Sequence, residues 1–203
     1  MAHFAKRYSL QIFLFALVFI FAVAAAWIYW PKAEALPLRG QAPEFSLENV
    51  DGSTVTMSGT NGKVRLVYFF FANCPDVCPP TTYMLNEVQD QLKEKDVFGS
   101  DVNIMSITFD PERDTREALL NWATVKNKAD LSGWYFLRGD EAGTAKLMEQ
   151  FQSAVIKDND GNFSHTNLII LVDQDGNFRK WYNANDLEVD SDVITKDVMS
   201  LVK

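Results

Sequence analysis

Cysteine and histidine are scarce in this chain of 203 residues, which has two of each. Cys74 and Cys78 stand only four positions apart, so a disulfide between them would close a very short loop. In the loop-entropy model such a bridge constrains the unfolded chain by about 2 kcal/mol, less than a long-range bridge would. A purely structural disulfide is therefore a poor explanation of the pair, and metal binding and redox chemistry stay open.

Basic charge is also in short supply, since 19 lysines and arginines stand against 27 acidic residues and the formal net charge is −8. Lys6 and Arg7 are the only charged residues before residue 31, so the rest of the chain carries −10. An acidic surface argues against a nucleic acid as partner. The sequence has no internal repeat and no low-complexity segment, and its length suits one ordinary domain plus an appendage.

Calcium loops lack the residues that they need. Asp158–Asn162 and Asp173–Asn177 are rich in carboxylates, but both place glycine fourth, where a calcium loop places it sixth. Ile169 stands at the twelfth position counted from Asp158, which a calcium loop fills with glutamate. We therefore predict that both stretches are turns.

An apolar run extends from Ile12 to Trp30, and with Leu10 it makes about 20 residues, or roughly 30 Å of helix, enough for a bilayer core. Lys6 and Arg7 precede the run, which predicts a cytoplasmic N-terminus. A cleaved signal peptide is the alternative, but the run is longer than the apolar region of such peptides. We expect a single-pass anchor in a bacterial inner membrane, with the rest of the chain in the periplasm.

The chain divides into three predicted parts. Residues 1–30 are a cytoplasmic tail and transmembrane anchor, residues 31–41 a linker, and residues 42–203 the folded domain. Alternating strands and helices, followed by a hairpin and a closing helix, predict an α/β fold with one mixed central sheet flanked by helices. The strands are expected at 44–48, 54–57, 63–71, 102–109, 134–137, 168–172 and 178–182, and the helices at 81–95, 114–126, 140–151 and 193–201. The first two strands would form an N-terminal β-hairpin around Asp51-Gly52.

The cysteines lie between a predicted strand and a predicted helix. The apolar run at 63–71 is typical of a central strand buried on both faces, and apolar residues recur at helical spacing over 81–95. Cys74 and Cys78 are therefore expected near a helix N-terminus, which favours the thiolate. If the backbone between them is helical, their Cβ atoms lie roughly 5 to 6 Å apart, which suits either one metal ion or a disulfide.

His165 is the only histidine in the part of the chain that we expect outside the cytoplasm. It lies in a polar segment that we interpret as a loop, which would reach the end of the sheet where the cysteines lie. Together with Cys74 and Cys78 it would make a donor set of two sulfurs and one nitrogen, suited to Cu(I), Cu(II) or zinc. Structural zinc usually has four protein ligands, so three donors favour copper, and the open position would permit transfer to another protein.

The segment Asp110-Pro111-Glu112-Arg113-Asp114-Thr115 follows the strand at 102–109. If that strand is parallel to the strand before the cysteines, this segment lies on the same edge of the sheet. Asp114 and Glu117, three residues apart, make a capping-box arrangement. A loop followed by a capped helix is the simplest interpretation of the segment.

These residues together resemble the Sco family, also called SenC. The resemblance rests on Cys-Pro-Asp-Val-Cys-Pro after an aromatic strand, Asp-Pro-Glu-Arg-Asp-Thr after the next strand, the later histidine, and Leu-Val-Asp-Gln-Asp-Gly-Asn-Phe. It extends from about Ala42 to the C-terminus. It implies a thioredoxin-like fold and a copper site made by Cys74, Cys78 and His165, with Asp110 in the second shell of the metal. It also implies a metallochaperone that takes copper from a donor chaperone and delivers it to the copper-accepting subunit of cytochrome c oxidase, to build the binuclear centre.

Two positions depart from the pattern of that family. Phe71-Ala72-Asn73 precedes the first cysteine, where relatives often have an aromatic residue and a threonine, and Ser164 precedes the histidine, where relatives commonly have aspartate. The ligands themselves are intact, so we expect copper binding. The redox potential and partner recognition are the properties that the two changes would affect.

A thiol-disulfide oxidoreductase that reduces partner cysteines in the periplasm is the alternative function. One cysteine would attack a partner disulfide and the other would resolve the mixed disulfide. Against it, three residues separate Cys74 from Cys78, whereas two separate the cysteines of the usual thioredoxin-like redox motif. A peroxidase would need one activated cysteine among threonine and arginine, and the sequence has Arg113 but not that motif.

Overall fold

The computed structural model describes residues 2–29, 35–72, 78–158 and 163–203, and it divides into two units, Met1–Ala35 and Leu36–Lys203. In the first unit, helix α1 spans Ala2–Tyr29, where the sequence predicts an apolar helix. Over the residues that the structure describes, no helix is long and apolar enough to cross a membrane. Trp30, at which the predicted anchor ends, lies outside the described residues, and the anchor stays a prediction.

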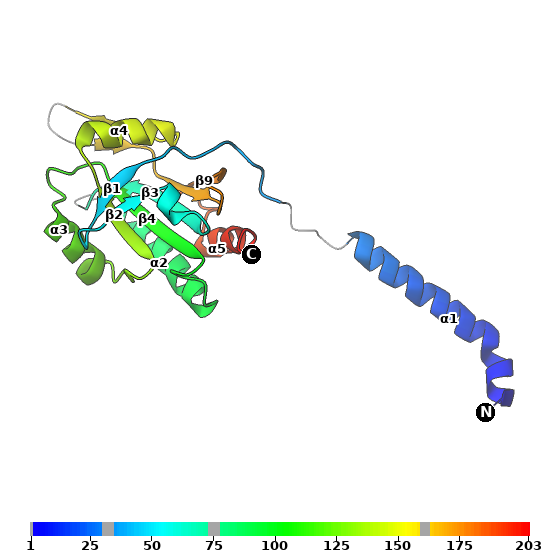
Figure 1. Ribbon diagram of the computed structural model, residues 1–203. Helices are drawn as coiled ribbons and strands as arrows, with labels where there is room; N and C mark the ends of the chain where they lie inside the picture. Colours follow the sequence, from blue (N-terminus) through cyan, green and yellow to red (C-terminus); the bar gives the residue numbers. More distant parts are fainter. Residues whose placement is uncertain (1, 30–34, 73–77, 159–162) are drawn as a thin grey trace. The chain divides into compact units, whose positions relative to one another are not determined.

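In the described part of the second unit, seven strands form a mixed sheet and two short strands pair separately (Figure 1). The strands of the sheet are β1 (Ser46–Asn49), β2 (Thr54–Thr56), β3 (Val64–Phe70), β4 (Val102–Thr108), β5 (Trp134–Arg138), β8 (Leu168–Val172) and β9 (Phe178–Asn183). Their order is β2-β1-β5-β4-β3-β8-β9, with β3, β4 and β5 parallel and the other pairs antiparallel. The separate pair is β6 (Val155–Lys157) and β7 (Phe163–His165). The predicted mixed sheet is confirmed.

Helices cover both faces of this sheet. They are η1 (Ser58–Thr60), α2 (Cys78–Glu94), α3 (Arg116–Asn121), the π-helical turn η2 (Trp122–Lys126), α4 (Glu141–Gln150) and α5 (Ser191–Met199). Helices α2 and α5 lie side by side (Figure 1). Asp140 is the N-cap of α4, and its side chain accepts a hydrogen bond from the Gly143 N–H at 2.7 Å.

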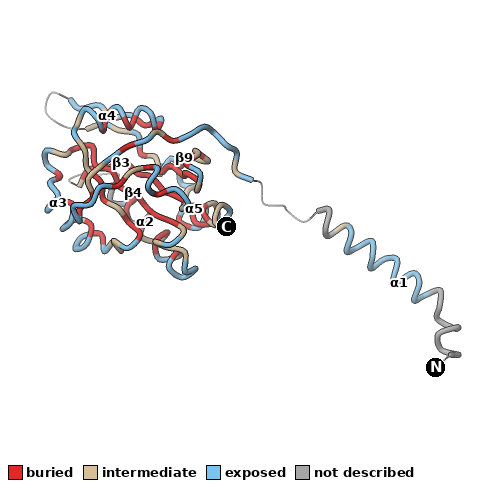
Figure 2. Tube along the Cα trace, viewed as in Figure 1, coloured by how far each residue is buried: buried red, intermediate tan, exposed pale blue. Residues whose placement is uncertain are grey.

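The core lies on both sides of β3, all seven residues of which are buried (Figure 2). Successive side chains of a strand point to opposite faces of the sheet, so Phe69 and Phe70 pack into the core on opposite sides of it. Phe69 packs edge-on against Phe151 at the end of α4, with ring centroids 5.5 Å apart. Phe70 packs against Trp122 of η2 on the other face, at 4.9 Å. This two-sided burial explains why the strand has no polar alternation, and it gives the residues that follow a rigid starting point.

Arg65 is a fully buried charge inside β3. Its guanidinium donates to the carbonyl oxygens of Thr60 at 3.3 Å, Lys63 at 2.5 Å and Gln174 at 3.3 Å. Burial lowers the pKa of Arg65 to about 10, so the group remains charged near neutral pH. The residue holds two turns at the end of the sheet where β3 begins, opposite to the end where the cysteines follow.

The structure describes both of the predicted hairpins, the one around Asp51-Gly52 and the one around Asp173–Asn177. The N-terminal hairpin forms as β1 and β2, and β1 also pairs with β5, which joins the hairpin to the main sheet. Asp173–Asn177 is a turn, as predicted, in which the Asp173 carboxylate accepts hydrogen bonds from the Asp175 and Asn177 N–H groups. The other predicted turn, Asp158–Asn162, lies mostly outside the described residues.

Two predictions for the helix after β4 are wrong. Thr115, rather than Asp114, is the N-cap of α3, and its side chain accepts from the Ala118 N–H at 3.2 Å. The sequence also predicts a buried stripe of Ala118, Leu119, Trp122 and Val125, of which Leu119 is buried and Trp122 partly buried, whereas Ala118 and Val125 are exposed, Val125 by 68%. For Val125 the physical reason is the change to π-helical turns at Trp122, which alters the residues per turn and buries Ala123 instead.

Candidate metal centre

The carboxyl ends of β3 and β4 form one edge of the sheet. The two strands are parallel, and Phe70 lies opposite Thr108 in their register. Phe71 and Phe109 therefore follow at the same edge, and their rings lie 5.3 Å apart. The prediction that the residues after β4 share this edge with the residues after β3 is confirmed. In open α/β sheets this edge is where ligands usually bind.

Only part of the cysteine turn is described. Cys78 is the first residue of α2, as expected for a sulfur near a helix N-terminus, and the structure describes its backbone but not its side chain. Cys74 lies outside the described residues, together with the rest of 73–77. The ligand roles of both cysteines therefore stay predictions.

His165 lies beside this edge, enclosed by aromatic rings. It is the last residue of β7, which pairs with β6, so the prediction of a loop at this position is wrong. Its ring centroid lies 5.0 Å from that of Phe109 and 6.2 Å from that of Phe71, three residues before Cys74. Phe163 completes the enclosure, 5.4 Å from Phe71 and 5.2 Å from Phe109. The structure thus brings His165 to the strand end that leads into the cysteines.

A hydrogen bond to the backbone selects one tautomer of His165. Nδ1 lies 3.0 Å from the carbonyl oxygen of Thr166. Because a carbonyl oxygen can only accept, Nδ1 carries the proton and Nε2 has the lone pair that a metal ion needs. Burial is the larger influence on the ring and lowers the pKa of His165, which keeps the imidazole neutral near neutral pH. Both effects suit a metal ligand.

Asp110, which is predicted to lie near the metal, is 2% exposed and stands two residues after the end of β4. It forms an ion pair with Arg113. The guanidinium of Arg113 lies over the rings of Phe71 at 5.9 Å and Phe163 at 5.4 Å. Asp110 therefore acts on the aromatic enclosure of His165 through Arg113, and its predicted place near a metal remains untested.

Asp114 is a residue at this edge whose contact the sequence analysis missed. Its Oδ2 accepts from the Ala72 N–H at 2.9 Å and from the Thr108 hydroxyl at 2.5 Å. Its Oδ1 is buried and has no hydrogen-bond partner among the residues that the structure describes. Burial is the largest influence and raises the pKa of Asp114. This carboxyl group joins the last described residue before the cysteines to the loop after β4, a contact that the apparent capping box concealed.

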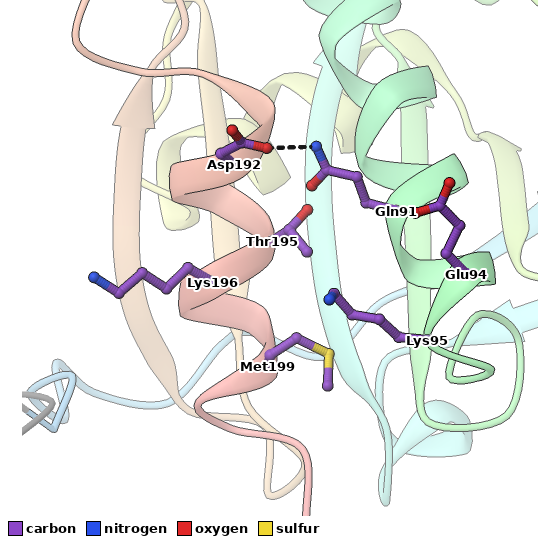
Figure 3. A pocket seen from close by; sticks show the side chains of 7 residues that line it. All are labelled: Gln91, Glu94, Lys95, Asp192, Thr195, Lys196 and Met199. Atoms are coloured by element: carbon purple, nitrogen blue, oxygen red, sulfur yellow. Dashed lines mark hydrogen bonds between the residues drawn. The ribbon is translucent and has the colours of Figure 1, made fainter.

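Among the described residues, which leave out Cys74 and the side chain of Cys78, no group of three or more histidine, cysteine, aspartate or glutamate side chains could hold a metal ion. A groove of about 550 Å³ lies between α2 and α5 (Figure 3). Gln91 and Asp192 close one part of it through a hydrogen bond of 2.7 Å. Gln91 follows Cys78 by roughly 20 Å along the helix axis, so this groove is separate from the candidate centre.

The sequence of this chain is similar to proteins of one known family. The family model described as SCO1/SenC matches residues 36–203. A Bacillus subtilis protein named SCO1 protein homolog is 30% identical over 167 residues, covering 81% of this chain and 84% of its own length. The human mitochondrial SCO1 homolog is 32% identical, and the match covers 70% of this chain but 47% of the human protein. This chain therefore matches about half of the length of that relative.

Solved structures show the same likeness. A SCO1/SenC family lipoprotein from Bacillus anthracis has a TM-score of 0.75 and 31% identity, covering 83% of this chain and 99% of its own. Bradyrhizobium japonicum ScoI, solved with copper bound, has a TM-score of 0.65 and 29% identity over 80% of this chain and 99% of its own. BsSco, described as having a disulfide switch and as belonging to a family of cytochrome c oxidase assembly proteins, has a TM-score of 0.70 and 30% identity, covering 81% and 95%. The mixed sheet flanked by helices matches these structures, and the chain belongs to the SCO1/SenC family.

Proposed function

We propose that this chain binds one copper ion through Cys74, Cys78 and His165 and delivers it during assembly of the binuclear copper centre of cytochrome c oxidase. The observation that carries the proposal is the state of His165. Its ring lies at the strand end that leads into the cysteines, and its Nδ1–H is held by the Thr166 carbonyl oxygen. Nε2 is thereby left as a neutral nitrogen donor.

The chemistry of the donors fits copper. Two thiolates and one imidazole are soft to borderline ligands that suit Cu(I) and Cu(II) and do not suit magnesium or calcium. Hydrogen bonding of the other ring nitrogen is the usual support for a histidine ligand. Three protein ligands leave a position open for a ligand of the receiving protein, so stepwise ligand exchange can transfer the ion. The copper-bound relative from Bradyrhizobium supports the same metal.

The place of action follows from the N-terminal segment. We propose that residues 12–30 anchor the chain in a bacterial inner membrane and that residues 42–203 act in the periplasm. The Bacillus anthracis relative is described as a lipoprotein, which supports attachment to a membrane. Copper donation and acceptance would then occur outside the cytoplasm, in a compartment where disulfides can form.

A copper titration of the full chain tests the proposal. The reduced and the oxidised protein are compared with Cys74→Ser, Cys78→Ser and His165→Ala. We expect one copper ion per reduced chain, none tightly held by the oxidised chain, and a loss of Cu(II) affinity in His165→Ala larger than for any change outside the cysteines. Asn103→Ala, a buried change at the start of β4, is the matched control. Copper binding that ignores cysteine oxidation would contradict the proposal.

Thiol-disulfide exchange is the second candidate function, because the related BsSco is described as having a disulfide switch. Cys74 and Cys78 would then form a reversible disulfide, and the reduced pair would pass its electrons to a partner disulfide. An insulin-reduction assay without metal separates the two functions. Rapid turnover by the wild type, lost in Cys74→Ser, would favour the oxidoreductase.

A further inference from the structure

The two halves of the candidate centre come from distant parts of the chain. Cys78 begins α2, and His165 ends β7, which belongs to the separate pair of strands. The backbone between them runs through most of the sheet, so local structure does not set their separation. A direct link between α2 and the segment after β7 would set it, and the structure contains one.

The link consists of Thr81 on α2 and Asn167 two residues after His165. Asn167 Nδ2 donates to Thr81 Oγ1 at 2.9 Å, and Thr81 Oγ1 lies 3.2 Å from Asn167 Oδ1, which can accept from it. Asn167 Nδ2 also donates to Asn185 Oδ1 at 2.8 Å, so both of its hydrogens have partners. Thr81 is 1% exposed and Asn167 4% exposed. The link is therefore buried, and both the nitrogen and the oxygen of the Asn167 amide form hydrogen bonds in it.

The link is close to both halves of the centre. Thr81 follows Cys78 by three residues, and side chains three apart are neighbours on a helix surface. On the other side, Thr166 lies between His165 and Asn167, and its carbonyl oxygen accepts from His165 Nδ1. The backbone of Asn167 is fixed as well, because its carbonyl oxygen accepts from the Ala184 N–H at 2.9 Å. Movement at Asn167 would therefore move the group that orients the imidazole.

A role in the stability of the fold alone explains the hydrogen bonds of Asn167 less well than a role in positioning the candidate centre. A buried asparagine that serves its own strand would bond to nearby backbone groups. The three hydrogen bonds given for the Asn167 side chain all reach side chains of two other segments, those of Thr81 and Asn185. Burying such polar groups costs free energy unless every partner is present, and an apolar pair would fill the space at lower cost.

We propose that Thr81 and Asn167 are positioning residues that hold the cysteine helix and His165 at the separation at which the imidazole completes the donor set. This inference rests on the proposed function. Two thiolates are a sufficient soft site for Cu(I), whereas Cu(II) draws on the imidazole nitrogen. The link therefore controls Cu(II) binding and leaves Cu(I) binding nearly unchanged.

The experiment uses the full chain, reduced and kept in a mild detergent because its N-terminal helix is apolar. The variants are Thr81→Val and Asn167→Leu, which remove the hydrogen bonds at nearly constant volume, and Thr81→Ser, which keeps the hydroxyl. Asn103→Leu is the matched control, since Asn103 is also fully buried and bonds to the Gly133 carbonyl oxygen at 3.2 Å, far from the candidate centre. Affinities for Cu(I) and Cu(II), the sulfur-to-copper absorption band and the melting temperature are measured for each.

We expect Thr81→Val and Asn167→Leu to lose about ten-fold or more in Cu(II) affinity and to shift the absorption band, as is typical when a partner behind a metal ligand is lost. Cu(I) affinity should change by less than about two-fold, since the imidazole contributes little to a two-thiolate site. Thr81→Ser should keep the wild-type band. Asn103→Leu should lower the melting temperature without moving the band or the Cu(II) affinity.

Wild-type Cu(II) affinity and band in both Thr81→Val and Asn167→Leu would overturn the inference, as would equal changes in Asn103→Leu. If Asn167→Leu does not fold, Thr81→Val decides. A wild-type chain whose copper binding ignores Cys74, Cys78 and His165 would overturn the proposed function itself. Wild-type binding through those residues, unaffected by the variants, would overturn the positioning role alone.

Discussion

Asp114 shows how a single carboxyl group connects two loops at the edge of the sheet. One of its oxygens accepts hydrogen bonds from Ala72 and Thr108, and the other is buried with no partner in the described part of the chain. A buried acceptor without a donor is costly, and it is more costly when charged. Folding therefore shifts the equilibrium of this carboxyl group toward the protonated form, which agrees with the raised pKa.

The raised pKa of Asp114 fixes the sign of a pH dependence. In the folded state the group keeps its proton at pH values at which the unfolded chain, with a pKa near 3.8, has lost it. The stability that it contributes is present below the unfolded pKa and is lost as the pH rises through the folded value. Asp114→Asn cannot ionise and keeps an oxygen that accepts from Ala72 and Thr108. We expect the stability of this variant relative to wild type to increase with pH over that interval.

Urea unfolding of both proteins at a series of pH values on either side of 3.8 measures this difference. Because all other titrating groups are shared, the difference between the two proteins isolates Asp114. Above the folded pKa the difference should become constant. A difference that is flat throughout, or that decreases as the pH rises, would show that the carboxyl group is not the source.

At the scale of elements, the helix α3 after β4 depends on its N-cap residue. Thr115 accepts a hydrogen bond from the Ala118 N–H and so satisfies one of the free donors of the first turn. Thr115→Ala should lower the free energy of unfolding by about 1 kcal/mol, as is typical for the loss of such a cap. Thr115→Ser keeps the oxygen that accepts the hydrogen bond, so its free energy of unfolding should equal that of wild type. Thermal or urea unfolding of the three proteins decides, and an unchanged Thr115→Ala would contradict the cap.

The elements also show what the sequence could predict. β3 and α2 were predictable because a run buried on both faces and a helical repeat are local patterns. β6 and β7 were not, since three residues each are too few for a period. The exposure of Val125 was not predictable either, because the sequence carries no signal for the switch from α- to π-helical turns.

The metal-donor residues of the candidate centre were predictable from the sequence, but the hydrogen bonds that hold the surrounding segments together were not. Cys74, Cys78 and His165 are the residues that an inventory of soft ligands selects, and their types are visible in the sequence. The contacts that support the centre join positions far apart, Ala72 with Asp114 across 42 positions and Thr81 with Asn167 across 86. Such pairs leave no local pattern, so only the folded chain identifies them.

For the whole molecule, copper binding should appear as added stability. A ligand that binds the folded chain and not the unfolded one stabilises it by about 2.7 kcal/mol at one hundred times its dissociation constant. We expect the melting temperature of the reduced full chain to rise on addition of one equivalent of copper, and that of the oxidised chain to stay constant. Differential scanning calorimetry of both forms, with a Cys74→Ser chain as control, measures the effect. An equal rise in the oxidised chain would place the copper elsewhere.

β6 and β7 pair with each other outside the main sheet, so their free energy of local unfolding is set by other contacts than that of the main sheet. A hairpin of two strands is marginally stable alone, whereas β3 lies inside the seven-stranded sheet, between β4 and β8, with both faces covered. Local unfolding free energies are lowest where few buried contacts hold an element. The pair that carries His165 is therefore joined to the main sheet through side-chain contacts, those of Phe163 and His165 with the rings of Phe71 and Phe109, rather than through strand pairing. The resistance of this pair to local opening depends on those ring contacts.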